Sequence, residues 1–153
     1  MLILGIDPGS RITGYGVLDV TTATPRYVAS GCIRTRGDDL AQRLAQVYAG
    51  ISELIGVHGP ASSPSSRCSC QECRFCLKLG QARGTAIVCA ANHGLPVSEY
   101  GPRQIKQAVT GSGGADKLQV QHMVTAVLGL DGSPSRCGGC LAIALTHAHA
   151  RSG

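Results

Sequence analysis

The first residue whose type and position suggest chemistry is Asp7. Four apolar residues and one glycine (residues 2–6) run directly into it, and Pro8 and Gly9 then turn the chain away. A short apolar run bounded by turn residues predicts a strand buried on both faces. A carboxylate at the end of such a strand normally has a partner or a metal ion. The alternative is an aspartate that only caps the turn, and the spacing alone does not separate the two.

The remaining sequence predicts the elements that must hold this carboxylate in place. Short apolar segments predict further strands at 14–20, 26–34 and 95–100, the first two completing an antiparallel meander. Periodicity predicts helices that begin near 38, 77, 102, 116 and 141, with start signals at Asp38 and Asp39 and at Pro102. Two patches, 59–76 and 133–140, interrupt every pattern. This order predicts an α/β fold with a mixed sheet flanked by helices.

Composition narrows the class of protein. A chain of 153 residues is most simply one domain, 1–153, and its net charge of +5 favours a polyanionic partner. Since no run reaches about 18 apolar residues and no signal peptide precedes the first strand, we expect a cytoplasmic protein without a membrane span. Six of the eight cysteines fall in the two disturbed patches, which is unusual for that compartment.

Six blocks of the sequence resemble one known family. They are G-I-D-P-G-S-R-x-T-G-Y-G at 5–16, S-G-C-I-R-T at 30–35, L-K-L-G-Q-A-R-G at 77–84, R-Q-I-K-Q at 103–107, Q-V-Q-H-M-V at 119–124 and L-A-I-A-L-T-H at 141–147. In order and spacing these blocks are similar to those of the RuvC family of Holliday-junction resolvases.

The resemblance implies a ribonuclease-H-like fold, in which a five-stranded mixed sheet has helices on both faces. It implies a homodimer that binds four-way junction DNA and nicks it symmetrically in recombination and repair, alongside the branch-migration complex RuvA-RuvB. Family members hold two Mg²⁺ (or Mn²⁺) ions with four acidic residues. Two such ions suit phosphodiester hydrolysis, because they activate water and stabilise the leaving oxygen.

The resemblance also assigns site residues. Asp7 matches the first family acid, whereas the other three acids fall at Ser66, Cys137 and Cys140. The lysines that the family places near the scissile phosphate match Lys106 and Lys117, which are therefore expected to act in catalysis and DNA binding. Three further residues have two interpretations each: Arg83 and Arg103 contact DNA or pack within the fold, and His147 approaches the metals or lies in the core.

The two disturbed patches, 61–76 and 135–140, are each explained by a shift of reading frame. Codons chosen for residues 61–69, read two bases later, encode E-F-A-I-E-Q-V-F-M, which is the family strand with its glutamate. Codons for 135–140, read one base later, encode A-D-A-A-D. The hypothesis is a gene or a sequence with compensating single-base lesions. Taken literally, the chain keeps one of four acids and is expected to be inactive, retaining at most junction binding; Ser-Ser-Pro-Ser-Ser at 62–66 is then not expected to form a central strand.

A rival interpretation takes the cysteines literally. Paired cysteines close in sequence are a signal for a structural Zn²⁺ site, and the chain would then be a zinc-binding or nucleic-acid-binding module without catalysis. Two further cysteines, Cys32 and Cys89, lie in apolar family blocks and are expected to be inert core residues. The thiols of the zinc hypothesis are Cys68, Cys70, Cys73, Cys76, Cys137 and Cys140.

Overall fold

A computed structural model describes residues 1–9, 11–66, 73–132 and 138–153, with the backbone alone at 66 and 73–76. The strands are β1 (Leu2–Asp7), β2 (Ile12–Asp19), β3 (Arg26–Arg34), β4 (Ser63–Ser66) and β5 (Val97–Tyr100). The helices are α1 (Leu40–His58), α2 (Cys73–Asn92), α3 (Pro102–Thr110), α4 (Lys117–Leu128) and α5 (Gly138–Ser152). Of the described residues, no helix is both long and apolar enough to span a bilayer.

The strands form one five-stranded sheet in the order β3-β2-β1-β4-β5. β1 pairs antiparallel with β2, from Leu2 opposite Asp19 to Asp7 opposite Gly14, and β2 pairs antiparallel with β3. β4 runs parallel to both β1 and β5. This arrangement confirms the predicted α/β fold with a mixed sheet, and it places Asp7 at the end of a central strand.

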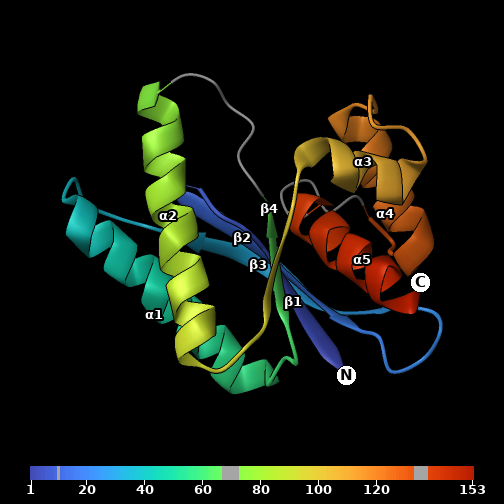
Figure 1. Cartoon of the computed structure of the whole chain (residues 1–153), viewed down its shortest axis with the longest axis horizontal. Coiled ribbons are helices and arrows are strands. Elements are labelled where there is room, and N and C mark those ends of the chain that lie inside the picture. The colour runs from blue at the N-terminus through green and yellow to red at the C-terminus, as the bar shows by residue number, and fades with distance from the viewer. Residues whose placement is uncertain (10, 67–72, 133–137) are drawn as a thin grey trace.

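Helices cover both faces of the sheet, as Figure 1 shows, with α1 and α2 on one face and α3, α4 and α5 on the other. Successive residues of β1 serve opposite layers, since Ile3 packs toward α5 and Leu4 packs toward α1. Both faces of this strand are therefore buried, as its unbroken apolar run predicts.

Two glycines allow α5 to lie directly on the sheet. A Cβ atom at Gly5 would stand 2.3 Å from the carbonyl oxygen of Cys140, and one at Gly16 would stand 2.7 Å from Cδ2 of Leu141. No larger residue fits without moving the helix. This close approach brings the first turn of α5 to the end of β1 that carries Asp7.

The prediction that Ser62–Ser66 cannot form a central strand is wrong. β4 occupies 63–66 between β1 and β5; the Leu4 N–H donates to the Ser62 carbonyl (3.1 Å), and the Ser63 N–H donates to the Pro96 carbonyl (3.0 Å). Backbone pairing does not require apolar side chains, and the neighbouring strands supply the partners. Ser62 and Ser65 are the residues of this segment that pair with β1, opposite Ile3 and Ile6. Pro64, which has no N–H to donate, lies between them.

The helix ends follow local signals. α1 begins after Asp39, whose side chain accepts from the Ala41 N–H (3.3 Å), and ends at Gly59 in a left-handed conformation. Pro102 takes the first position of α3, as expected. In contrast, α2 and α5 begin at Cys73 and Gly138, a few residues before their predicted starts, because both reach into the disturbed patches.

Candidate functional site

The carboxylate of Asp7 lies beside the first turn of α5. Asp7 ends β1 opposite Gly14, and its side chain is exposed to solvent. A Cβ atom on Gly139 would stand 3.1 Å from the Oδ2 atom of Asp7. The amino end of a helix carries partial positive charge, so the first turn of α5 and the Asp7 carboxylate are electrostatically complementary.

Three elements converge at this end of the sheet. Because Ile6 pairs with Ser65, the backbone of Ser66 stands level with Asp7 on the neighbouring strand. Cys140 lies in the first turn of α5, almost completely buried, with its carbonyl oxygen above Gly5. Two of the positions at which acids are expected, Ser66 and Cys140, are therefore brought next to Asp7, and Cys137 lies outside the described residues.

The side chains present here do not fit two Mg²⁺ ions. Mg²⁺ prefers oxygen ligands and carboxylates, whereas the first turn of α5 offers a glycine at 139 and a buried thiol at Cys140 beside the one carboxylate of Asp7. Within the described part of the chain, no group of three or more His, Cys, Asp or Glu residues is arranged to hold a metal ion. The zinc hypothesis remains a prediction, because Cys68, Cys70 and Cys137 lie outside the described residues.

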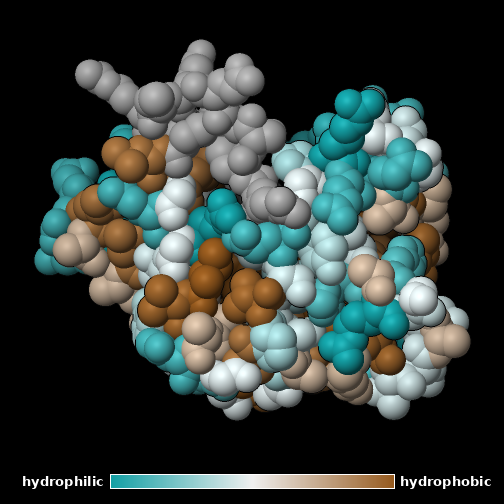
Figure 2. Space-filling view, viewed as in Figure 1, coloured by the Kyte–Doolittle hydropathy of each residue, from teal (hydrophilic) through white to brown (hydrophobic). Residues whose placement is uncertain are grey.

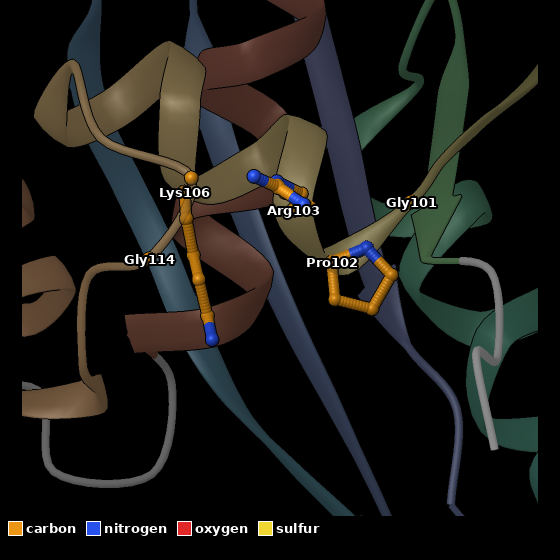
Figure 3. Close-up of a pocket in the computed structure, with 6 residues that line it drawn as sticks. Gly101, Pro102, Arg103, Lys106 and Gly114 are labelled. Carbon is orange, nitrogen blue, oxygen red and sulfur yellow. The ribbon is translucent and has the colours of Figure 1, made fainter.

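A pocket of about 630 Å³ lies between the start of α3 and the loop that follows it (Figure 3). In the close-up, Lys106 extends away from α3, and Arg103 projects from the same helix one turn earlier. The Gln107 side chain fixes the loop, since its Nε2 donates to the Gly111 carbonyl (2.9 Å) and its Oε1 accepts from the Gly113 N–H (3.0 Å). The pocket is lined by Gly101, Pro102, Arg103, Lys106, Gly113 and Gly114.

The structure therefore brings two of the predicted DNA-binding residues, Arg103 and Lys106, into one pocket. A third of the four predicted residues, Lys117, begins α4 after the same loop and has an exposed side chain. Both α3 and α4 pack against α5, the helix whose first turn lies beside Asp7. A pocket lined by one guanidinium and one ammonium group suits a phosphate group, because both groups bind phosphate oxygens strongly.

Arg83 has a partner within the fold. It lies in α2, and its Nε atom donates to the Oε1 atom of Glu99 in β5 (2.7 Å), with a second contact from its terminal nitrogen. This is the packing interpretation of Arg83, and a DNA contact by this residue stays a prediction. Sequence reasoning missed Glu99, because nothing in the local pattern links two residues 16 positions apart.

His147 lies in the core, away from Asp7. Its Nε2 atom is 3.1 Å from the Ser62 hydroxyl, and its Nδ1 atom is 2.8 Å from the Tyr100 hydroxyl. Ser62 stands opposite Ile3, four residues before Asp7, which is about 13 Å along a strand. Burial lowers the pKa of His147, and the nearby charge of Arg151 lowers it further. His147 is therefore a neutral residue that links strands to α5.

The two isolated cysteines differ in their surroundings. Cys89 is fully buried, its sulfur lies 3.4 Å from the Tyr48 carbonyl, and burial raises the pKa of its thiol. This agrees with an inert core residue. Cys32, on β3, is only half-buried, so the prediction of a core position is wrong for it, because β3 is an edge strand with most of its length partly exposed.

Comparison with known proteins agrees with the resemblance seen in the sequence. The family model for crossover junction endodeoxyribonuclease RuvC matches residues 3–147. The chain is 68% identical over 154 aligned residues to the crossover junction endodeoxyribonuclease RuvC of Chromohalobacter salexigens, an alignment that covers 99% of this chain and 83% of the relative.

Solved structures agree in fold over the whole chain. The RuvC structure from Thermus thermophilus superposes with a TM-score of 0.90 at 34% identity, covering 100% of this chain and 97% of that one. The same protein in complex with a Holliday junction substrate superposes with a TM-score of 0.91 at 35% identity, covering 100% and 96%. The motifs, the sheet order and these matches lead to one conclusion: the chain belongs to the RuvC family of crossover junction endodeoxyribonucleases.

Proposed function

We propose that this protein acts on four-way DNA junctions as a resolvase, nicking two strands symmetrically in recombination and repair. The observation that carries the proposal is the convergence of Asp7, the end of β4 and the first turn of α5 at one point of the sheet. Asp7 would be the first catalytic acid and metal ligand of that site. The similar Thermus thermophilus protein is known in complex with a Holliday junction substrate, which supports the choice of DNA.

Hydrolysis requires more acids than the present residues supply. The family depends on divalent metal ions, which activate water and stabilise charge on the phosphate, and we propose Mg²⁺ or Mn²⁺, two per site, for a chain that carries acids at 66, 137 and 140. Correcting the frame shifts in 61–76 and 135–140 would restore those three acids. With Ser66, Cys137 and Cys140 in place, we propose instead that the protein binds junctions without cutting them.

The proposed DNA contacts start from the pocket of α3. Arg103 and Lys106 line it, Lys117 begins the next helix, and the net charge of the chain is +5. We propose that Lys106 and Lys117 offset charge on the phosphate at the site and that Arg103 binds the backbone nearby. Arg83 is a weaker candidate for a DNA contact, since Glu99 already occupies its guanidinium.

A homodimer would match the two-fold symmetry of a four-way junction. Figure 2 shows hydrophobic residues gathered over α1 and α2, while the top of α3 is hydrophilic. On the outer face of α2, Leu77 is 64% exposed and Val88 is 52% exposed, and a Cβ atom on Gly80 or Gly84 would meet no atom within 4 Å. We propose this α2 face as the contact between subunits, and the cytoplasmic RuvA-RuvB complex as the partner that moves the junction.

One experiment tests the proposal in two steps. The intact mass of the purified protein, with peptide masses across 60–76 and 134–141, establishes which residues these segments contain. Labelled four-way junction and matched linear duplex are then incubated with the protein, with and without Mg²⁺. A protein with the cysteine segments should bind the junction selectively without cutting it, and one with the acids should produce paired nicks.

Three results would each overturn part of this proposal. Equal affinity for junction and duplex would remove the resolvase function. Bound zinc in stoichiometric amount, together with loss of folding on chelation, would favour the zinc-binding module. Cleavage by a protein whose mass matches the cysteine segments would show that Asp7 does not need three acidic companions.

A further inference from the structure

A chain of three buried polar side chains links the segments of β4 and β5 to helix α5. The exposed fractions are 1% for Ser62, 6% for His147 and 8% for Tyr100. The imidazole of His147 lies between the two hydroxyls, at 3.1 Å from Ser62 Oγ and 2.8 Å from Tyr100 Oη. The rings of Tyr100 and His147 also meet edge to face, with centroids 5.9 Å apart. Every polar atom of these three side chains therefore has a partner in a dry environment.

Each member of this chain comes from a different segment of the fold. Ser62 precedes β4 and accepts the Leu4 N–H of β1 through its carbonyl, Tyr100 ends β5, and His147 lies in α5. A neutral imidazole donates from one nitrogen and accepts at the other. Both hydrogen bonds form only when α5 holds one position along the sheet. A shift of the helix by one residue would separate both hydroxyls from the His147 ring.

His147 and Tyr100 each belong to a segment that reaches the candidate site. His147 lies in α5, and the first turn of this helix, two helical turns before His147, places Gly139 beside Asp7. Tyr100 is followed directly by Gly101, and Gly101 caps α3 and lines the pocket of Arg103 and Lys106. The same hydrogen bonds thus hold the start of α3 and the start of α5 relative to the sheet.

We propose that Ser62, His147 and Tyr100 are positioning residues, which fix α5 and the start of α3 so that Asp7 and the α3 pocket face the same DNA. The consequence for DNA rests on the proposed function, whereas the positioning itself does not. Catalytic geometries tolerate errors of only about 0.5 Å, so a buried chain of hydrogen bonds at a distance can affect binding at the site.

The test uses the full-length protein and three variants. Tyr100→Phe and Ser62→Ala each remove one hydroxyl from the chain. Thr146→Val is the matched control, since Thr146 is a buried residue of the same helix whose hydroxyl donates only to its own helix, at the Ala142 carbonyl (2.8 Å). For each protein, backbone amide NMR shifts and urea unfolding are measured together with affinity for a four-way junction and for duplex.

We expect Tyr100→Phe to shift the amide signals of both 101–103 and 139–141 and to weaken junction binding about fivefold, as the loss of one hydrogen bond implies. Thr146→Val should leave the amide signals of both segments and the junction affinity unchanged, even if it lowers the urea unfolding midpoint as much as Tyr100→Phe does. Shifts confined to the residues around Tyr100, or equal effects from Thr146→Val, would overturn the positioning role. If wild-type protein shows no preference for junctions, the resolvase proposal fails, and the amide shifts still decide whether the chain positions the two helices.

Discussion

Two buried serines on the same strand segment have opposite environments. Ser62 faces α5, and its hydroxyl lies 3.1 Å from the His147 ring. Ser65 faces the layer of α1 and α2, and its buried hydroxyl has no hydrogen-bond partner among the described residues. A buried hydroxyl without a partner costs about 1–3 kcal/mol. One face of β4 is therefore adapted to serine, and the other is not.

This difference bears on the origin of the segment. The frame-restored strand would place apolar residues on the α1–α2 side of β4, where Ser65 now lies in the layer built by Leu4, Ile6 and Val47. The unpaired hydroxyl is a physical mismatch of the kind that a frame shift would introduce. The backbone of β4 is nevertheless paired on both sides, so the sheet tolerates the change at a cost in stability.

The largest effect is expected from breaking the contact of α5 with β1. Gly5→Ala places a methyl group 2.3 Å from the Cys140 carbonyl oxygen, and we expect a loss of about 3 kcal/mol in unfolding free energy, measured by urea denaturation. Gly56→Ala is the control: it lies in open space within α1, and better helix propensity should stabilise the protein by about 0.5–1 kcal/mol. Equal behaviour of the two variants would show that α5 does not rest on Gly5.

The contrast between the two serines can be measured directly. Ser65→Ala removes a hydroxyl without a partner and should raise the unfolding free energy by about 1 kcal/mol. Ser62→Ala leaves a nitrogen of His147 without its partner and should lower it by about 1 kcal/mol. Urea denaturation of both variants gives the two signs, and a destabilising Ser65→Ala would contradict the environment assigned to that residue.

His147 makes the α5 face sensitive to acid. Burial holds the pKa of His147 below its usual 6.5 in the folded protein, so the unfolded chain binds the extra proton more readily. Stability should therefore be constant above the unfolded pKa and fall as the pH drops below it. Unfolding midpoints between pH 8 and 5, compared with those of His147→Gln, test this; the variant should lose the part of the pH dependence that is due to His147.

The smallest effect is expected on the α2 side of β5, where Arg83 meets Glu99. Both side chains are about a quarter exposed, at 27% and 29%, so a double-mutant cycle should give a coupling of only about 0.5–1 kcal/mol. Glu99→Gln should leave junction affinity unchanged. If Arg83 also contacts DNA, Arg83→Gln will weaken junction binding, whereas a purely structural role predicts the same affinity for both variants.

Local sequence was sufficient for several features. The apolar run before Asp7 predicted a central strand, because a strand buried on both faces must be apolar throughout. Asp39 and Pro102 marked helix starts, since capping depends on residues within one turn. The family blocks predicted the mixed sheet and the membership that the comparisons confirm.

Other features required the folded chain. The serines at 62–66 carry no strand signal, and β4 forms because β1 and β5 offer backbone partners on either side. The partners of Arg83 and His147 lie 16 and 85 residues away along the chain, in the case of Glu99 and Ser62. Amino-acid order alone determined which segments are apolar and where helices start. Tertiary packing decided which polar groups meet, because such contacts depend on distances that no local pattern contains.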